Sequence, residues 1–329
     1  MNGVLIIDKS PGLTSHDVVH RARRILNQRS VGHLGTLDPM ATGVLPLVIG
    51  SFTRLAQFYL RSEKTYEGII RFGFSTDTYD AEGEPTSEPK NVAPGREELE
   101  KVASCFRGII SQTPPPFSAK KIKGTPAYKL ARRQNEVRLE PVQVVIKEFE
   151  IISTVADRLT FRARVGSGTY IRSVAHNMGE MVGCGAHLES LRRTSVAEFT
   201  LAEAHTLEEV AGAKGVLSAP LGESPVGTLE SSPPVSLAGS TAPPGQRPVG
   251  TLELLDELFV HPRRLLPSLP SVTADEMTVA HIRSGRPVNL PELSRARQVK
   301  VFSGQRDLIA IATRVAGTLF HPKIVLCGS

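Results

Sequence analysis

Apolar residues recur along the chain with two periods, which separate predicted strands from predicted helices. Short apolar runs, or apolar and polar residues in alternation, predict strands, whereas apolar residues three or four positions apart predict helices. The predicted strands cover Val4–Ile7, Val44–Ile49, Thr65–Phe74, Val142–Ile152 and Leu159–Val165. The predicted helices cover Arg54–Leu60, Tyr170–Val182 and a segment that starts after Thr14. These strands and helices follow no regular strand–helix–strand repeat, which predicts an α+β fold around a mixed sheet.

The first predicted helix carries its own start signal. Thr14 is followed three residues later by Asp17, a spacing typical of a capping box. Val18, Ala22 and Ile25 then recur at helical spacing, which predicts one apolar face directed at a core.

Residues 212–250 interrupt this pattern of strands and helices. Seven Pro, seven Gly and six Ser make up half of residues 211–250, a composition that resists packing and predicts a disordered insert. The hexapeptide Pro-Val-Gly-Thr-Leu-Glu occurs at residues 225–230 and again at 248–253. Two copies are too few for a folded repeat, and we assign this segment no function.

Short apolar runs resume in the last part of the chain. They cover Val299–Phe302, Leu308–Ala312 and Lys323–Leu326 and are separated by turns. Such a pattern predicts a small β-rich domain, which we place at residues 269–329. Residues 251–268 are expected to be a connecting segment that belongs to the N-terminal domain, residues 1–211.

Composition describes an ordinary water-soluble chain, with 40% hydrophobic and 22% charged residues. Cys105, Cys184 and Cys327 lie far apart and form no Cys/His cluster, so neither a zinc site nor a disulfide framework is predicted. The first apolar run is too short for a signal peptide, and no stretch approaches the ~20 apolar residues of a membrane span. We therefore expect a cytoplasmic protein without membrane association.

Positive charge is concentrated in one segment. The whole chain has a net charge of +6, and from Phe117 to Lys147 eight basic residues stand against two acidic ones. Pro114–Pro116 and Gly124 indicate a protruding loop, about residues 112–135, that leads into a helix. Such a loop suits a phosphate backbone, although a solvated face is the alternative. The residues that we expect at the backbone are Lys120, Lys121, Lys123 and Arg132.

The segment Gly32–Gly43 reads Gly-His-Leu-Gly-Thr-Leu-Asp-Pro-Met-Ala-Thr-Gly and places one carboxylate in a loop rich in glycine. Glycines let a backbone pass close to a bulky ligand, and Asp38-Pro39 fixes a turn around the acid. Asp38 is then either a reactive carboxylate at the mouth of a cleft or a turn residue bonded to its own backbone. The sequence shows no Walker loop, Rossmann fingerprint or metal-ligand cluster, so neither a cofactor nor a metal is expected.

This segment resembles the defining motif of the TruB-type tRNA pseudouridine synthases. Other segments resemble further motifs of that family, in the family's order, across roughly residues 3–210. They are Asp8–Gly12, Lys64–Tyr66, Thr76–Glu84, Gln112–Ala119, Gly168–Ser173, Cys184–Leu188 and Leu191–Thr194. From about Pro270 onward the chain resembles, more weakly, a PUA-type RNA-binding domain.

The resemblance implies a pseudouridine-synthase fold in which helices flank a central mixed, mostly antiparallel sheet. It also implies conversion of uridine to pseudouridine at position 55 of tRNA, with the T-stem-loop as partner and no obligatory protein partner. That reaction breaks the N1–C1′ bond and joins C5 to C1′. Glycoside hydrolysis uses two carboxylates, but a leaving uracil that delocalises its charge and is recaptured needs only one.

The resemblance assigns the chemistry to three residues. Asp38 is the essential carboxylate, and it is expected to pair with Arg172, whose guanidinium favours the ionised acid. Whether Asp38 attacks the sugar or abstracts its 2′ proton stays open. Tyr66 is expected to stack on the target base and to handle a proton during the rearrangement. Without the resemblance, Arg172 is a surface helix residue and Tyr66 a packing residue.

Four more residues are expected to bind the substrate. His33 would fill the hole left when the target base is extruded from the RNA. Tyr170 and Leu191 would contact the nucleotide, and Lys9 would support the pocket or a phosphate. The structural alternatives are a hydrogen-bonded loop histidine for His33 and plain core for Leu191.

The chain departs from the family pattern at two positions and in the insert. Phe117 stands where the family usually has Tyr, and Ala197 where it usually has Gly. Two rival functions are a guide-RNA-dependent pseudouridine synthase and a non-catalytic tRNA-binding or folding factor. Met40–Gly43 is typical of stand-alone bacterial enzymes, and a factor that only binds RNA needs no positioned carboxylate.

Overall fold

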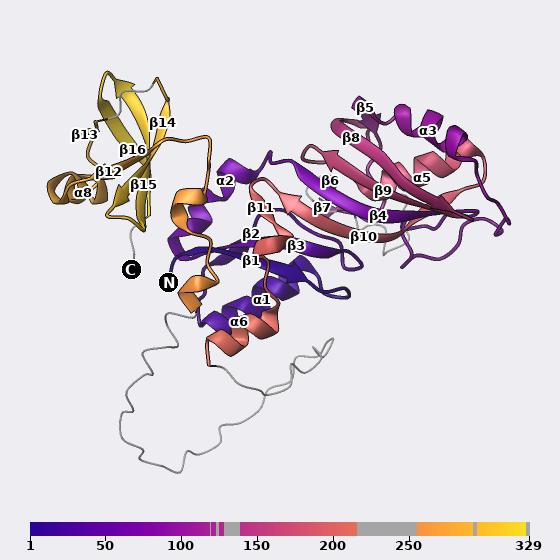
Figure 1. Ribbon diagram of the computed structural model, residues 1–329, viewed down its shortest axis with the longest axis horizontal. Coiled ribbons are helices and arrows are strands. Elements are labelled where there is room, and N and C mark those ends of the chain that lie inside the picture. Colours follow the sequence, from indigo (N-terminus) through magenta and orange to yellow (C-terminus); the bar gives the residue numbers. More distant parts are fainter. Residues whose placement is uncertain (119, 123–124, 128–138, 216–254, 292–294, 327–329) are drawn as a thin grey trace, which may run out of the picture.

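The computed structural model describes residues 1–118, 120–122, 125–127, 139–215, 255–291 and 295–326. Two main sheets organise these residues, a nine-stranded sheet in the N-terminal part and a five-stranded sheet in the C-terminal part (Figure 1). The predicted α+β class with a small β-rich C-terminal domain is therefore confirmed.

The nine-stranded sheet has the order β1-β3-β10-β4-β9-β8-β5, with β2 beside β3 and β11 beside β10. Its strands are β1 (Gly3–Lys9), β2 (Val31–His33), β3 (Thr42–Ile49), β4 (Lys64–Phe72), β5 (Gly108–Gln112), β8 (Val142–Val155), β9 (Arg158–Val165), β10 (Ala186–Val196) and β11 (Phe199–Thr200). β3 and β10 run parallel, with Arg193 opposite Gly43, and the other described pairs of this sheet are antiparallel. The sheet is thus mixed and mostly antiparallel, as predicted. A two-stranded hairpin, β6 (Lys121–Ile122) and β7 (Thr125–Pro126), lies apart from it.

Helices pack on two parts of this sheet (Figure 1). α1 (Ser15–Leu26) and α6 (Leu207–Ala213) share an apolar core with β1 and β3, whereas α3 (Arg96–Ser104) and α5 (Ile171–Val182) share one with β4, β8, β9 and β10. Thr14 forms the predicted capping box, because its Oγ1 accepts from the Asp17 N–H at 3.1 Å and its own N–H donates to the Asp17 carboxylate at 2.9 Å. The helix predicted near residues 54–60 is present as the 3₁₀ turn η1 (Gly50–Leu55) followed by α2 (Ala56–Tyr59).

The C-terminal domain is a five-stranded sheet of order β12-β14-β15-β16-β13 with one helix against it. Its elements are β12 (Ser271–Ala274), α8 (Glu276–Arg283), β13 (Val288–Asn289), β14 (Gln298–Ser303), β15 (Asp307–Ala316) and β16 (Leu319–Val325). An apolar cluster that includes Phe52, Leu55, Phe302 and Leu326 joins it to the β1–β3 part of the N-terminal sheet. Arg54 adds a hydrogen bond to the Val325 carbonyl at 2.8 Å.

The segment between the domains returns to the N-terminal sheet. Val260 donates its N–H to the Val4 carbonyl at 2.8 Å, and Phe259 forms a bridge with Leu5. The 3₁₀ turn η3 (Pro262–Arg264) then leads toward β12, as the earlier turn η2 (Leu201–Glu203) leads toward α6.

Parts of two predicted segments lie outside the described residues. Of the insert predicted at residues 212–250, residues 216–250 lie outside the described part of the chain. Helix α6 extends to Ala213 and so includes the first two residues of the stretch predicted to be disordered. In the predicted basic loop, Lys123 and Arg132 lie outside the described residues. No helix in the described part of the chain is long and apolar enough to cross a membrane.

Candidate active site

Asp38 lies in the loop between β2 and β3, residues 34–41, which we call the Asp38 loop. Two hydrogen bonds fasten this loop to the start of α1, since Leu37 donates its N–H to Ser15 Oγ at 2.8 Å and that hydroxyl donates to the Leu37 carbonyl at 3.1 Å. The Asp38 carbonyl accepts from the Ala41 N–H at 3.1 Å. The backbone therefore forms a turn, while the carboxylate stays 33% exposed and free for another partner.

That partner is Arg172, in the first turn of α5. Its Nη2 donates to Asp38 Oδ1 at 3.2 Å, and its Nε lies 2.9 Å from Oδ2 at an angle that makes no hydrogen bond. The Arg172 side chain is only 7% exposed. A nearly buried guanidinium thus holds one side of a carboxylate that stays partly exposed to solvent.

Arg172 also contacts two other segments of the chain. Nη1 donates to the Thr78 carbonyl at 3.1 Å and lies 3.4 Å from Asp80 Oδ2, while Nη2 donates to the Phe117 carbonyl at 3.0 Å. Asp80 is 3% exposed. Sequence reasoning placed Asp80 in a family motif without giving it a role. The structure puts it on the opposite side of the same guanidinium from Asp38.

The turn that carries Thr78 and Asp80 is clamped against α5. Tyr79, between them, has a φ of 66° and stacks on His176, with ring centroids 3.8 Å apart. His176 lies one helical turn after Arg172, so both side chains extend from the same face of α5. The His176 ring thus holds the turn whose Thr78 and Asp80 contact the Arg172 guanidinium. Thr78 Oγ1 donates to Asp80 Oδ1 at 2.6 Å, which fixes that carboxylate further.

The start of the predicted basic loop is attached to the N-terminus of α5. The buried Gln112 amide donates to the Tyr170 carbonyl at 3.1 Å and accepts from the Tyr170 N–H at 2.8 Å. Ser173 Oγ donates to the Thr113 carbonyl at 2.8 Å. Further along, Lys120 donates to the Glu140 carbonyl at 3.3 Å, and Lys121 lies in β6.

The Asp38 loop packs through Leu37 and Ala41 on an apolar cluster, which we call the apolar wall. Tyr66 on β4 and Leu191 on β10 are buried in the same cluster as Leu37 and Ala41 of the Asp38 loop. Burial raises the pKa of the Tyr170 phenol, and the nearby Asp38 carboxylate adds to this effect. The phenol is therefore neutral at neutral pH. Such a wall can exclude water from one side of Asp38.

Lys9, at the end of β1, holds the Asp38 loop through a hydrogen bond to its backbone. Its ammonium donates to the carbonyls of Ser10, Leu13 and Pro39 at 2.9, 2.7 and 3.0 Å, and the residue is 1% exposed. Burial lowers its pKa to about 8, although the Asp38 carboxylate opposes that shift. Because all three donors bond to backbone, the geometry favours support of the pocket over contact with a phosphate.

His33 ends β2 and stands before the Asp38 loop. Burial, together with the charge of Arg193, lowers the pKa of its imidazole. Its Nδ1 is buried and has no hydrogen-bond partner among the described residues. The ring is therefore neutral at neutral pH, a state compatible with stacking on a base.

Sequence reasoning missed Arg193 on β10. Its side chain is fully buried, and it donates to the carbonyls of Val44, Thr36 and Gly35 at 2.8, 3.1 and 3.0 Å. Two of these carbonyls belong to the Asp38 loop. The one available signal was its spacing from Leu191, because residues two apart on a strand share a face and an arginine on a core face is unusual.

No group of three or more His, Cys, Asp or Glu side chains that could hold a metal ion occurs in the part of the chain that the structure describes. The site brings together the Asp38 carboxylate and the Arg172 guanidinium beside the apolar wall.

Two family models match successive parts of the chain. The model of the TruB family pseudouridylate synthase N-terminal domain matches residues 23–171, and that of the tRNA pseudouridylate synthase B C-terminal domain matches residues 172–224. The tRNA pseudouridine synthase B of Solibacter usitatus (strain Ellin6076) is 44% identical over 99% of this chain and 100% of its own length. That of Azoarcus sp. (strain BH72) is 38% identical over 94% of this chain and 90% of its own length.

Solved structures share the fold at lower identity. An H/ACA RNP bound to a substrate RNA containing 2′-deoxyuridine includes a chain with a TM-score of 0.65 and 21% identity, covering 99% of this chain and 85% of that one. A Cbf5-Nop10-Gar1 complex gives a TM-score of 0.64 and 22% identity, with the same coverage. At this identity the likeness extends to the fold alone.

Proposed function

The chain belongs to the TruB family of pseudouridylate synthases, and from this premise we propose that it isomerises uridine at position 55, in the T-loop of tRNA. The observation that carries the proposal is the pairing of the nearly buried Arg172 with the partly exposed Asp38, beside an apolar wall. Binding RNA alone requires no carboxylate held in this way.

The chemistry requires one ionised carboxylate and protection from water. Asp38 either attacks C1′ of the ribose or abstracts its 2′ proton, and both routes begin from the ion pair with Arg172. The N1–C1′ bond breaks, the uracil turns in place, and C5 bonds to C1′, after which the proton leaves C5. Tyr66 and Leu191, which line the apolar wall, would retain the detached uracil. Tyr66 would stack on the base and its phenol would help to move the proton.

The target uridine must leave the RNA stack before it reaches Asp38. His33 would fill the space that it leaves, because a neutral imidazole stacks on bases without paying for a buried charge. Tyr170 would contact the same nucleotide from the start of α5. Lys9 would keep the loop in place through the Pro39 carbonyl.

The RNA itself would be bound outside this pocket. Lys120, Lys121, Lys123 and Arg132 would meet the phosphate backbone, and the C-terminal domain would add a second RNA contact. We infer that the protein acts in the cytoplasm and needs no obligatory protein partner.

The proposal is tested by incubating the purified protein with an unmodified tRNA transcript, without guide RNA, and mapping pseudouridine by chemical labelling and primer extension. We expect one modified position, 55, and none in a matched transcript that carries cytidine there. Modification at another position, or only after a guide RNA is added, would contradict it.

A further inference from the structure

Ser118, in the predicted basic loop, has a buried hydroxyl that forms no hydrogen bond. The residue is 3% exposed, and its Oγ has no partner among the described residues. Buried polar side chains are nearly always hydrogen-bonded, and leaving one unpaired lowers stability. An unpaired hydroxyl in a folded protein is therefore a candidate for a bond that forms only when a ligand is bound.

The backbone around Ser118 is attached to the site that holds Asp38. The Phe117 carbonyl accepts from Arg172 Nη2 at 3.0 Å, and the same nitrogen donates to Asp38 Oδ1 at 3.2 Å. Earlier in the segment, the Gln112 amide holds the chain on the start of α5. Ser118 therefore follows directly after a residue that is bonded to the guanidinium of the ion pair.

The polar neighbour of the Ser118 hydroxyl is the Tyr170 phenol. Burial raises the pKa of this phenol, and the Ser118 hydroxyl beside it opposes that rise. No hydrogen bond joins the two oxygens, since Ser118 Oγ has no partner among the described residues. In the same part of the chain, the hydrogen bonds of Tyr170 all involve its backbone. Two neighbouring hydroxyls near the Asp38 carboxylate are thus unused.

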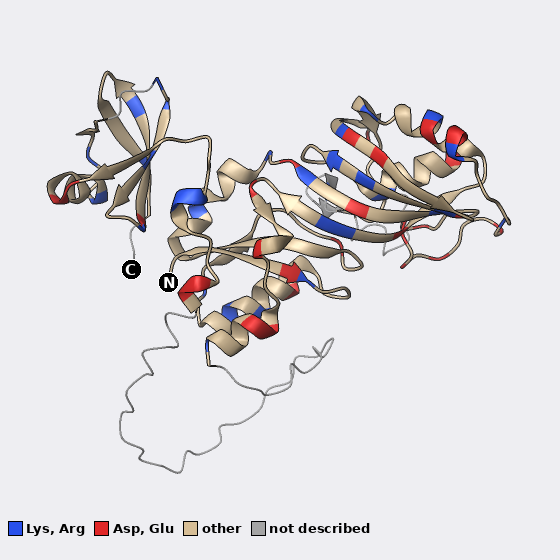
Figure 2. Cartoon of the chain, viewed as in Figure 1, with Lys and Arg blue, Asp and Glu red and all other residues tan. Residues whose placement is uncertain are grey.

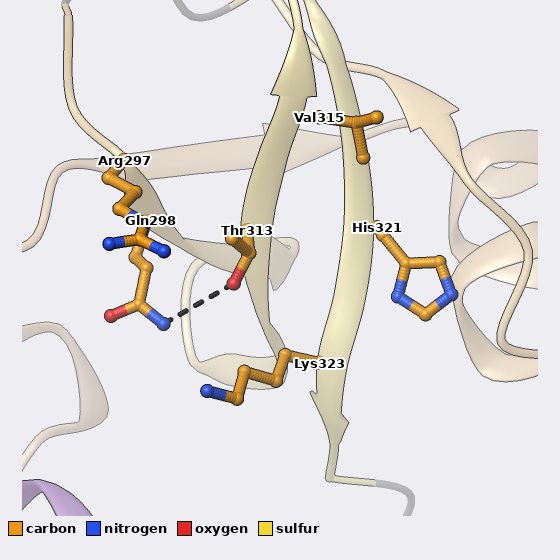
Figure 3. A pocket seen from close by; sticks show the side chains of 6 residues that line it. All are labelled: Arg297, Gln298, Thr313, Val315, His321 and Lys323. Carbon is orange, nitrogen blue, oxygen red and sulfur yellow. Dashed lines mark hydrogen bonds between the residues drawn. The ribbon is translucent and has the colours of Figure 1, made fainter.

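The phenol beside it distinguishes Ser118 from other polar groups. Ser51 in η1 also has a buried hydroxyl without a partner in the described part of the chain, so the unmade bond alone indicates no site. A cavity of about 480 Å³ on the C-terminal domain shows the opposite arrangement. There Gln298 Nε2 donates to Thr313 Oγ1 at 3.3 Å, so the amide and the hydroxyl satisfy each other (Figure 3). Ser118 combines an unmade bond with a neighbour that is expected to contact the nucleotide.

The hydrogen-bonding capacity of the two hydroxyls sets their roles. Each has one proton to donate and lone pairs that accept. If Ser118 donates to the phenolic oxygen, the phenol proton has to point away from Ser118. Ser118 Oγ is buried and does not reach the RNA itself, whereas Tyr170 is half-buried and partly open to solvent. Ser118 can therefore act on the substrate only through Tyr170.

We propose that Ser118 is a positioning residue for Tyr170. When RNA binds, the Ser118 hydroxyl donates to the phenolic oxygen, and the phenol proton is directed at an acceptor oxygen of the target nucleotide. The inference rests on the proposed function, which supplies that nucleotide. Removing the Ser118 hydroxyl then deprives the free protein of no hydrogen bond, but the complex with RNA of one.

A double-mutant cycle with the full-length protein and a T-stem-loop hairpin tests this role. Ser118→Ala is expected to lower kcat/KM about tenfold, the effect of one lost hydrogen bond, and to leave the Tm of the free protein unchanged. Tyr170→Phe should lose at least as much, and Ser118→Ala/Tyr170→Phe no more than Tyr170→Phe alone. Ser118→Cys, which keeps a weak donor of similar shape, should fall between Ser118→Ala and the wild type.

The matched control is Ser51→Ala, which removes the other buried and unpaired hydroxyl, in η1, and should keep the wild-type kcat/KM. Neither serine variant changes a charge, so the distribution of basic and acidic residues in Figure 2 stays the same, and with it the salt-dependent attraction of RNA. Wild-type activity of Ser118→Ala, a loss that adds to that of Tyr170→Phe, or an equal loss in Ser51→Ala would overturn the inference. A lower Tm of Ser118→Ala would also overturn it, because the hydroxyl would then hold the free protein together.

A wild-type protein that leaves every uridine of the hairpin unchanged would instead overturn the proposed function. The same cycle, measured on the Kd for the hairpin, then decides the role of Ser118. Coupling between the two substitutions supports that role, and independent losses contradict it.

Discussion

Three basic residues hold the Asp38 loop and its carboxylate in position. Arg172 forms an ion pair with the Asp38 carboxylate, whereas Lys9 and Arg193 donate hydrogen bonds only to backbone carbonyls of the loop. Arg193 is fully buried. Among the described residues, its guanidinium donates hydrogen bonds to three backbone carbonyls. A buried charge is costly unless it is paired or hydrogen-bonded. We therefore regard Arg193 as a positioning residue for the loop.

Replacing Arg193 tests this role. Arg193→Lys keeps the charge but replaces a planar guanidinium, whose Nε, Nη1 and Nη2 each donate to a different carbonyl, with a compact ammonium that does not reproduce those three positions. We therefore expect a lower kcat with a nearly unchanged KM for tRNA. Unsatisfied carbonyls should also lower the free energy of unfolding by about 1–3 kcal/mol. Arg192→Lys is the control, because Arg192 pairs with Asp8 at a half-exposed position. If Arg193→Lys loses stability but keeps the wild-type kcat, the residue only holds the fold together.

Lys9 makes folding dependent on pH. Its pKa falls from 10.5 to about 8 in the folded chain, so between these values the unfolded state binds more protons. The contribution of Lys9 to the free energy of unfolding therefore rises with pH across this window and is lowest below it. In urea denaturation at about pH 7 and about pH 10, the stability of the wild type relative to Lys9→Met should be greater at the higher pH. A relative stability that falls with pH would refute the assignment.

The roles of these residues differ in how far the sequence alone predicts them. Asp38 and Arg172 stand in motifs, and their chemistry follows from residue type. Asp80 lies in a motif too, but its contact with Arg172 depends on a turn in which Tyr79 has a positive φ. Arg193 lies in a motif as well, but it was given no role because its hydrogen-bond partners are backbone carbonyls more than a hundred residues away, and no residue type marks a carbonyl as a partner.

At the scale of elements, local periodicity predicted the long strands β1, β3, β4, β8 and β9 and the helices α1 and α5. It did not predict β10 or α3, or how the elements meet. The strands of residues 42–49 and 186–196 pair in parallel across a long stretch of chain, and no local pattern marks that pairing. This parallel pairing explains why a glycine stands at the end of the segment Gly32–Gly43. Gly43 has a φ of 101°, and a Cβ there would lie 2.2 Å from the Arg193 carbonyl oxygen.

Two glycine variants separate backbone strain from this close approach. Gly183→Ala, at a φ of 80° with open space around it, should lower the free energy of unfolding by about 1–2 kcal/mol from the left-handed conformation alone. Gly43→Ala adds a clash with the β10 backbone and should lower the free energy of unfolding by clearly more than Gly183→Ala. It should also reduce activity, because the clash displaces the neighbouring Asp38 loop. Equal losses for both variants in urea denaturation would show that the β3–β10 contact is unimportant.

At the scale of the whole molecule, the chain adds an unusual segment to a shared architecture. The residues described on either side of it, α6 and residues 255–260, both pack on the β1–β3 part of the N-terminal sheet. Its composition, rich in Pro, Gly and Ser, carries no signal for a site. The C-terminal sheet was predicted from three short apolar runs, but the register of its strands and its packing on the N-terminal part were not.

The insert should therefore be dispensable for catalysis. Replacing residues 216–250 with a short Gly/Ser linker should leave pseudouridine formation on a complete tRNA within about twofold of the wild type, because it leaves the packing on β1 intact. Initial rates on the same transcript measure this. A complete loss of activity in a variant with a wild-type Tm would show that the segment has a function.

We infer that Asp38, held by Arg172, performs the isomerisation. A single-turnover assay of Asp38→Asn with a complete tRNA, paired with a binding measurement, tests this role most directly. We expect no pseudouridine at position 55 and a Kd within about tenfold of the wild type, since the amide keeps the shape of the loop but cannot attack or take a proton. Turnover by Asp38→Asn at the wild-type rate would contradict the account.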